Sequence, residues 1–177
     1  MKITGKKQTF FLRTAMMVLT TILIVLFFAI MSMVGKIQGT ARVVNYAGLV
    51  RGGTQQMVKL EISGTPQDKM YQTISSYIEG LRNGSDELNF VCLDDQKFQR
   101  KMDELAGYFE ELRDEILLVR EKGYENTDII EKSERFFQIC DEAVGLSEEY
   151  SQRKATALDY LEKVVIVDIL GLILLIG

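Results

Sequence analysis

Few residues of this chain have side chains suited to chemistry. The 177 residues include no histidine and two cysteines, Cys92 and Cys140. The chain therefore lacks the commonest catalytic base and metal ligand, and it has too few cysteines for a four-cysteine zinc site or a disulfide-rich scaffold. The most informative polar residues are Arg51 and Gln55, which interrupt an apolar stripe between residues 37 and 62. A guanidinium at such a place can hold a small anion or carboxylate by forked hydrogen bonds.

The segment around Arg51 carries two stripes at helical spacing, rotated by about 100° from each other. The first stripe consists of Val43, Tyr46, Val50, Gly53, Met57 and Leu60. The second consists of Ile37, Ala41, Val44, Gly48, Arg51, Gln55, Val58 and Ile62. One stripe can face a bundle core, and we expect the second to pair with a second copy of the same helix across a two-fold axis. In the alternative interpretation, Arg51 lies at the edge of the bundle and pairs with an acid of the last helix.

Turn and cap residues divide the chain between residues 36 and 161 into four expected helices. Their predicted ranges are 36–62, 67–83, 95–122 and 127–161. The expected N-caps are Thr65 (with Pro66 in the first helical position), Asp94, and either Asn126 or Thr127. Short connections between four such helices predict an all-α, up-down-up-down antiparallel four-helix bundle over residues 35–161.

Apolar residues recur three and four positions apart in each of the later helices. The third helix shows Phe98, Met102, Leu105, Phe109, Leu112, Ile116 and Val119, and the second shows Met70, Ile74, Tyr77 and Leu81. The fourth shows Ile130, Phe137, Cys140, Val144, Leu158 and Leu161. On this pattern we expect Tyr46, Tyr77 and Tyr108 to be core residues rather than ligand-binding aromatics. We also expect Cys140 to be buried, Cys92 to lie in a loop, and the two to remain unbonded.

Two apolar runs flank the expected bundle. Residues 14–34 contain no charge and would span roughly 30 Å as a helix, so we expect a transmembrane helix rather than a cleaved signal peptide. Residues 1–13 carry four cations and no acid, which predicts a cytoplasmic N-terminus and an extracytoplasmic bundle in a bacterial plasma membrane. The run 164–177 is too short to span, and we expect it to be the incomplete start of a second transmembrane helix; a buried C-terminal helix is the alternative. Asp168 within it would make a polar contact across a dimer or reach up to water.

A family resemblance appears at the segment VNYAGLVRGGTQQMVKLEI. Its Asn45, Ala47, Gly48, Arg51, Thr54 and Gln55 match a helix-one pattern found in bacterial membrane sensors. The chain thus resembles the four-helix extracytoplasmic domains of nitrate/nitrite sensor kinases and the type IV pili methyl-accepting chemotaxis-like N-terminal domain. Segments 120–137 and 143–155 also resemble sensor regions of clostridial-type signalling proteins. Relatives often carry Arg or Lys directly after the Gln, where this chain has Gln56.

The resemblance implies a sensory input module that binds a small extracellular ligand, or a periplasmic or extracellular binding protein. Its ligand site would be built from Asn45, Gly48, Arg51, Thr54 and Gln55 at a homodimer interface. It also implies a cytoplasmic output domain beyond this sequence: a diguanylate cyclase or phosphodiesterase, a histidine kinase or a chemotaxis transducer. From the residues themselves we expect no catalytic site, metal or cofactor and no nucleic-acid partner. The alternative function is that of a structural or adaptor membrane protein.

Overall fold

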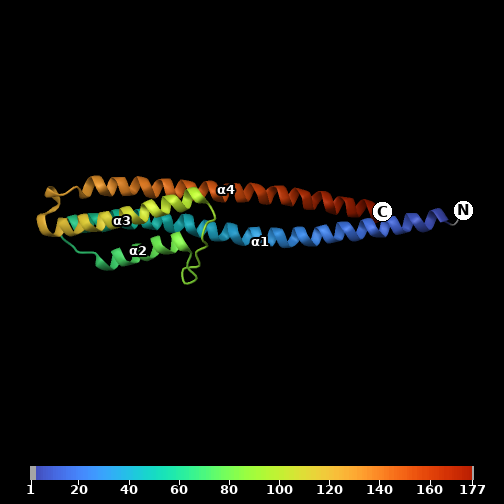
Figure 1. Ribbon diagram of the computed structural model, residues 1–177, viewed down its shortest axis with the longest axis horizontal. Coiled ribbons are helices and arrows are strands. Elements are labelled where there is room, and N and C mark those ends of the chain that lie inside the picture. Colours follow the sequence, from blue (N-terminus) through green and yellow to red (C-terminus); the bar gives the residue numbers. More distant parts are fainter. Residues whose placement is uncertain (1–2, 177) are drawn as a thin grey trace. The chain divides into compact units, whose positions relative to one another are not determined.

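The computed structural model describes residues 3–176, and nearly all of them are helical (Figure 1). The elements are α1 (Ile3–Ile62), α2 (Asp68–Asn83), α3 (Gln96–Lys122), the short 3-10 helix η1 (Tyr124–Asn126) and α4 (Ile129–Ile176). Within the described residues there is no strand, and one isolated antiparallel bridge joins Ser85 to Phe90. The predicted all-α class is confirmed.

The helices contribute to two compact units. We name the first the apolar unit; it comprises the described residues up to Ile37 together with those from Arg153 onward. We name the second the bundle unit, and it comprises Gln38–Gln152. Each of the long helices α1 and α4 supplies residues to both units.

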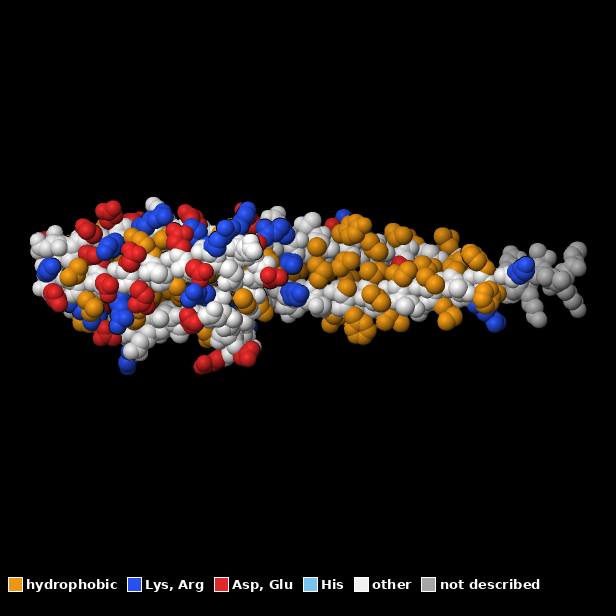
Figure 2. Space-filling view, in the orientation of Figure 1, with side chains coloured by type: hydrophobic (Ala, Val, Ile, Leu, Met, Phe, Trp, Pro, Cys, Tyr) orange, Lys and Arg blue, Asp and Glu red, His pale blue; other side chains and the backbone are white. Residues whose placement is uncertain are grey.

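The apolar unit turns large hydrophobic side chains outward. Phe10, Phe28 and Leu174 are 74%, 67% and 82% exposed, and Figure 2 shows hydrophobic side chains gathered over this part of α1 and α4. By length and composition, α1 is the one helix among the described residues that could cross a membrane. Asp168 is nevertheless buried in this unit, and its Oδ2 has no hydrogen-bond partner. The carboxylate therefore does not reach an exposed position within the unit.

The bundle unit has one hydrophobic core to which all four helices contribute. Every apolar residue predicted for α3 is buried, and so are Val43, Val50 and Met57 from the first stripe of α1. Tyr46 packs edge-on against the rings of Tyr77 and Phe90, with centroid distances of 4.9 and 4.5 Å. Tyr46, Tyr77 and Tyr108 are all partly buried against the core, as predicted.

The predicted core face of α4 is wrong by one residue over its first turns. Ile130 and Phe137 are 58% and 37% exposed, whereas their neighbours Ile129 and Phe136 are fully buried. Cys140 is buried as expected. The sequence places apolar residues in adjacent pairs here, so either member of each pair satisfies the helical spacing. In the observed register, Phe136 packs against Phe109 of α3 at a centroid distance of 5.5 Å.

The helix ends confirm the predicted stops at 62, 83 and 122 and correct the predicted starts. The N-cap of α3 is Asp95 rather than Asp94, and its carboxylate accepts hydrogen bonds from the N–H groups of Lys97 and Phe98. Helix α4 starts at Ile129, not at residue 127, because Thr127 follows η1 with an extended backbone (φ -140°, ψ 162°).

The expected cap of α2 by Thr65 and Pro66 is also wrong. Gly64, with a φ of 80°, ends α1, and Thr65 donates its N–H to the carbonyl of Leu60, which is the pattern of a Schellman motif. Thr65 therefore belongs to the end of α1. Gln67 occupies the N-cap position of α2, but its side chain accepts no hydrogen bond from the first turn of the helix. The backbone N–H of Gln67 donates a hydrogen bond to Glu61 Oε1 at 2.7 Å.

Candidate functional site

The guanidinium of Arg51 is held between α1 and α4 in the bundle unit. Its Nη1 donates to Oδ1 of Asp141, and its Cζ lies 5.3 Å from the centroid of the Phe137 ring. The side chains of Arg51 and Asp141 are 35% and 58% exposed, so solvent screens the pair. Within a single chain, Arg51 therefore pairs with an acid of the last helix, as the alternative interpretation of the sequence predicts.

The other predicted ligand residues lie in different surroundings. Gln55 donates its amide to the carbonyl of Ser133 on α4 at 3.0 Å. Thr54 is fully buried, and its Oγ1 has no hydrogen-bond partner. Asn45 is exposed and Gly48 half-buried, with open space where a Cβ at Gly48 would point. The structure therefore brings Arg51 and Gln55 together against α4 but places Thr54 in the interior and Asn45 in solvent.

The second stripe of α1, predicted as a dimer surface, is partly used by the chain itself. Val58 is 3% exposed within the single chain, and Ile62 packs against the same core. Ala41 is exposed, while Ile37, Val44 and Gly48 are half-buried. Val58 therefore contacts its own bundle rather than offering a surface to a partner, and the accessible part of the stripe lies nearer the apolar unit in sequence.

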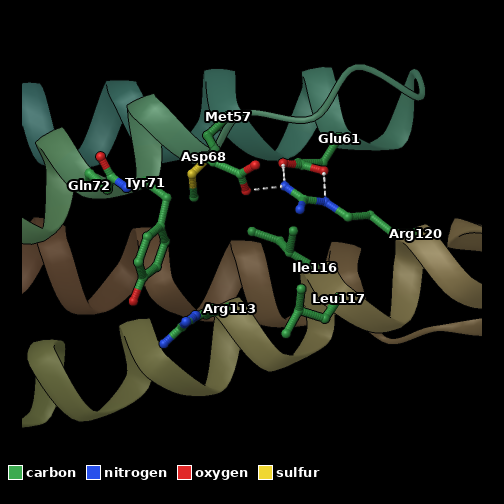
Figure 3. A pocket seen from close by; sticks show the side chains of 9 residues that line it. All are labelled: Met57, Glu61, Asp68, Tyr71, Gln72, Arg113, Ile116, Leu117 and Arg120. Atoms are coloured by element: carbon green, nitrogen blue, oxygen red, sulfur yellow. Dashed lines mark hydrogen bonds and ion pairs between the residues drawn. The ribbon is translucent and has the colours of Figure 1, made fainter.

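A second polar site lies where α1, α2 and α3 meet, and sequence reasoning missed it. A cavity of about 390 Å³ lies there. Figure 3 shows the side chains that line it: Met57, Glu61, Asp68, Tyr71, Gln72, Arg113, Ile116, Leu117 and Arg120. We call it the α1–α2–α3 pocket. It lies entirely within the bundle unit.

One end of this pocket is an ion-pair cluster around Arg120. The guanidinium donates to both oxygens of Glu61, at 2.9 and 2.6 Å, and to Oδ1 of Asp68 at 2.9 Å. These hydrogen bonds, first those to Glu61 and then that to Asp68, raise the pKa of Arg120. Glu61 is buried, whereas the side chain of Asp68 is 73% exposed. The cluster ties the end of α1 and the start of α2 to α3.

The other end of the pocket carries Tyr71 and Arg113. The Tyr71 ring stacks on Phe109 with a centroid distance of 5.0 Å, and its hydroxyl donates to Glu110 Oε1 at 2.9 Å. Burial, followed by the interaction with Glu110, raises the pKa of Tyr71. The Cζ of Arg113 lies 5.2 Å from the centroid of the Tyr71 ring, which fixes the guanidinium at this end.

The sequence contained a weak signal for this pocket. Arg113 and Arg120 are seven residues apart, so they lie on one side of α3, and Glu61 stands between the apolar residues Leu60 and Ile62 at the end of α1. What the sequence did not predict is that α2 starts with Asp68 beside Arg120.

Among the described residues, no group of three or more Cys, Asp or Glu side chains is placed to hold a metal ion. Comparison of the chain with protein-family models, with curated proteins and with solved structures gave no match.

Proposed function

We propose that this chain is the sensory input module of a bacterial membrane receptor. In this proposal the apolar unit lies in the bilayer, the N-terminus is cytoplasmic, and the bundle unit is an extracytoplasmic up-down-up-down bundle. The observation that supports it most is that α1 and α4 each run from a bundle with a charged surface into a unit whose hydrophobic side chains face outward (Figure 2). A helix that is continuous in this way can carry a displacement across a membrane.

The proposed sensing step centres on Arg51. A small anion or carboxylate would compete with Asp141 for the guanidinium and would loosen the link between α1 and α4. Two copies would pair along the accessible part of the second stripe, so that both Arg51 side chains act on the ligand. A shift of α1 against α4 would then pass to a cytoplasmic output domain of the cyclase, kinase or chemotaxis type. The ligand acts through its different affinity for the two arrangements.

Native thiols test the orientation. Cys92 is exposed and Cys140 is buried in the bundle unit, so an impermeant maleimide added to intact cells should label Cys92 without any engineered cysteine. A Lys7→Cys variant, with Cys92 replaced by serine, should react only after the cells are permeabilised. Lys7 is exposed near the start of α1, in the segment that we propose to be cytoplasmic. Labelling of Lys7→Cys but not Cys92 in intact cells would reverse the proposed topology.

A chimera that joins the chain to a known output domain tests the sensing step. With nitrate, acetate and succinate as probes, Arg51→Ala should abolish the response, and Lys at this position should restore little of it because it lacks the planar fork. Asp141→Asn should instead make the module respond at lower concentrations, since the competitor is removed. Arg82→Ala and Asp103→Asn are matched controls, because they break a pair of comparable exposure. A normal response in Arg51→Ala would exclude this role for Arg51 and leave it a surface charge. No response of the unsubstituted chimera to any probe would instead favour a structural or adaptor protein.

A further inference from the structure

The α1–α2–α3 pocket has the size and lining of a ligand site. Its volume of about 390 Å³ lies within the range of small-molecule sites. Its middle is apolar, formed by Met57, Ile116 and Leu117, and charged groups lie at both ends (Figure 3). Asp141 and Phe137, which contact Arg51, do not line this pocket.

Opposite charges with free hydrogen-bonding capacity lie at the two ends. Asp68 uses Oδ1 for Arg120 and is well exposed, so its second oxygen can accept a hydrogen bond from an ammonium group. Arg113 donates from Nη1 to Glu110 Oε2 over a long distance of 3.4 Å, interacts with the Tyr71 hydroxyl and is held over the Tyr71 ring. Its remaining N–H groups can hold a carboxylate in a fork.

The spacing of α3 sets the distance between these ends. Arg113 and Arg120 are separated by two helical turns, or about 10 Å along the helix axis. Asp68 is bound to Arg120, so the negative site lies at that end and the positive site lies at the Arg113 end. An extended peptide advances about 3.3–3.6 Å per residue, so three residues cover about 10 Å and two cover about 7 Å.

The balance of charge in the lining selects against simpler ligands. Glu61 and Asp68 offset Arg113 and Arg120, so a plain anion or cation is attracted at one end and repelled at the other. A single amino acid carries both charges but is too short to reach both ends. A short peptide offers its ammonium group to Asp68, its carboxylate to Arg113 and apolar side chains to the middle of the pocket.

We propose that the α1–α2–α3 pocket binds an apolar peptide of two or three residues with both termini free. The proposal goes beyond the sensory role and does not depend on it, because binding is measured directly and without an output domain. A failure of the proposed role of Arg51 would not affect the proposed peptide site. An absence of peptide binding would likewise not affect the proposed role of Arg51.

Calorimetry on the full chain in detergent micelles tests the proposal with leucyl-leucine as the probe. We expect it to bind, and we expect free leucine, N-acetyl-leucyl-leucine and leucyl-leucine amide each to bind at least about tenfold more weakly, as loss of a charged hydrogen bond predicts. No binding of leucyl-leucine or trileucine, or equal binding of free leucine or of the blocked forms, would overturn the proposal.

Two variants assign the ends of the peptide. Arg113→Gln should weaken leucyl-leucine binding by about tenfold but should not further weaken the amide, which lacks the carboxylate. Asp68→Asn should also weaken leucyl-leucine binding by about tenfold, but it should not further weaken the N-acetylated form, which lacks the ammonium group. Arg135→Gln is the matched control, because Arg135 is similarly exposed and makes a comparably long contact with Glu104. Both pocket residues are exposed, so circular dichroism should show unchanged folding. Unchanged binding by either pocket variant would refute the assignment of its end.

Discussion

At the residue scale, the two thiols differ in their surroundings and therefore in their reactivity. Burial raises the pKa of Cys140 to about 12, whereas Cys92 is exposed in the connection between α2 and α3. Since the thiolate is the reactive form, Cys140 should be inert in the folded chain. We expect one maleimide per chain in mild detergent and two after denaturation, measured by intact mass. A Cys92→Ser variant that still takes up label under native conditions would show that the register of α4 is wrong.

Glu115 is a buried acid with two partners from the start of α4. Its carboxylate accepts the N–H of Asp128 at 2.8 Å and a hydrogen bond from Lys132. The bond from Lys132 lowers the pKa of Glu115, and that from Asp128 adds to this, although burial acts in the opposite direction. The two bonds join α3 to α4 across the η1 connection.

We expect Glu115→Gln to lower the free energy of unfolding by about 1–3 kcal/mol at pH 7. Because the folded-state pKa is below the unfolded value, the stabilisation is complete above the unfolded pKa of about 4.3 and is lost as the pH falls through the folded value. The difference between the wild type and Glu115→Gln should therefore shrink in acid, as urea titrations at several pH values would show. Asp103→Asn, which affects an exposed pair, should cost less than about 1 kcal/mol. A pH-independent difference would contradict the assigned role of the carboxylate.

At the scale of elements, the connection between α2 and α3 depends on a close approach to Gly80. A Cβ at this position would lie 2.7 Å from the Phe90 ring and 3.3 Å from the Cβ of Ser85. The Phe90 ring is buried and packs against Tyr46, so it has little freedom to move away. The small residue therefore lets the connection fold back on α2.

Gly80→Ala should destabilise the bundle by about 1–3 kcal/mol, because an added methyl group overpacks the site. Gly107→Ala is the matched control, since nothing lies within 4 Å of a Cβ placed there on α3. The control should be more stable than the wild type by about 0.5–1 kcal/mol, as expected for Gly to Ala in an exposed helix. Thermal unfolding of both variants tests this, and equal melting temperatures would argue against the packing of Phe90.

The same elements show how far the sequence predicts the structure. The helix α3 has single apolar residues at regular intervals, so one face was possible and its whole core stripe was predictable. In α4 the pairs Ile129–Ile130 and Phe136–Phe137 left two faces possible, and tertiary packing decided between them. The N-cap of α2 was not predictable because Glu61, a side chain of the preceding helix, accepts the N–H of Gln67.

The candidate sites follow the same distinction. Arg51 stood out because it interrupts a stripe on one helix, and its placement beside α4 was one of the two arrangements that this stripe allowed. The α1–α2–α3 pocket combines side chains from three helices, and Arg113 and Asp68 are far apart in sequence. Neither residue interrupts an apolar stripe, so no local pattern marked them.

At the scale of the whole molecule, the division into two units predicts which part needs lipid. Each residue of the hydrophobic core, from Val43 to Tyr150, falls within the bundle unit. The apolar unit, by contrast, exposes residues such as Phe28 and Leu174, which favour transfer into a bilayer. The fragment 38–152 therefore contains the complete core, and the remainder contains the surface that water disfavours.

We expect the fragment 38–152 to fold in water without detergent, with a helical circular dichroism spectrum and a cooperative thermal transition. The full chain should aggregate unless detergent or lipid is present, because its exposed apolar side chains would otherwise associate. Leu112→Ala should destabilise the fragment by about 2–5 kcal/mol, since Leu112 is fully buried, whereas Leu117→Ala should cost much less because Leu117 is 45% exposed. An unfolded fragment would mean that the bundle unit depends on the apolar unit for its stability. Equal effects of the two substitutions would contradict the burial of Leu112 and the exposure of Leu117.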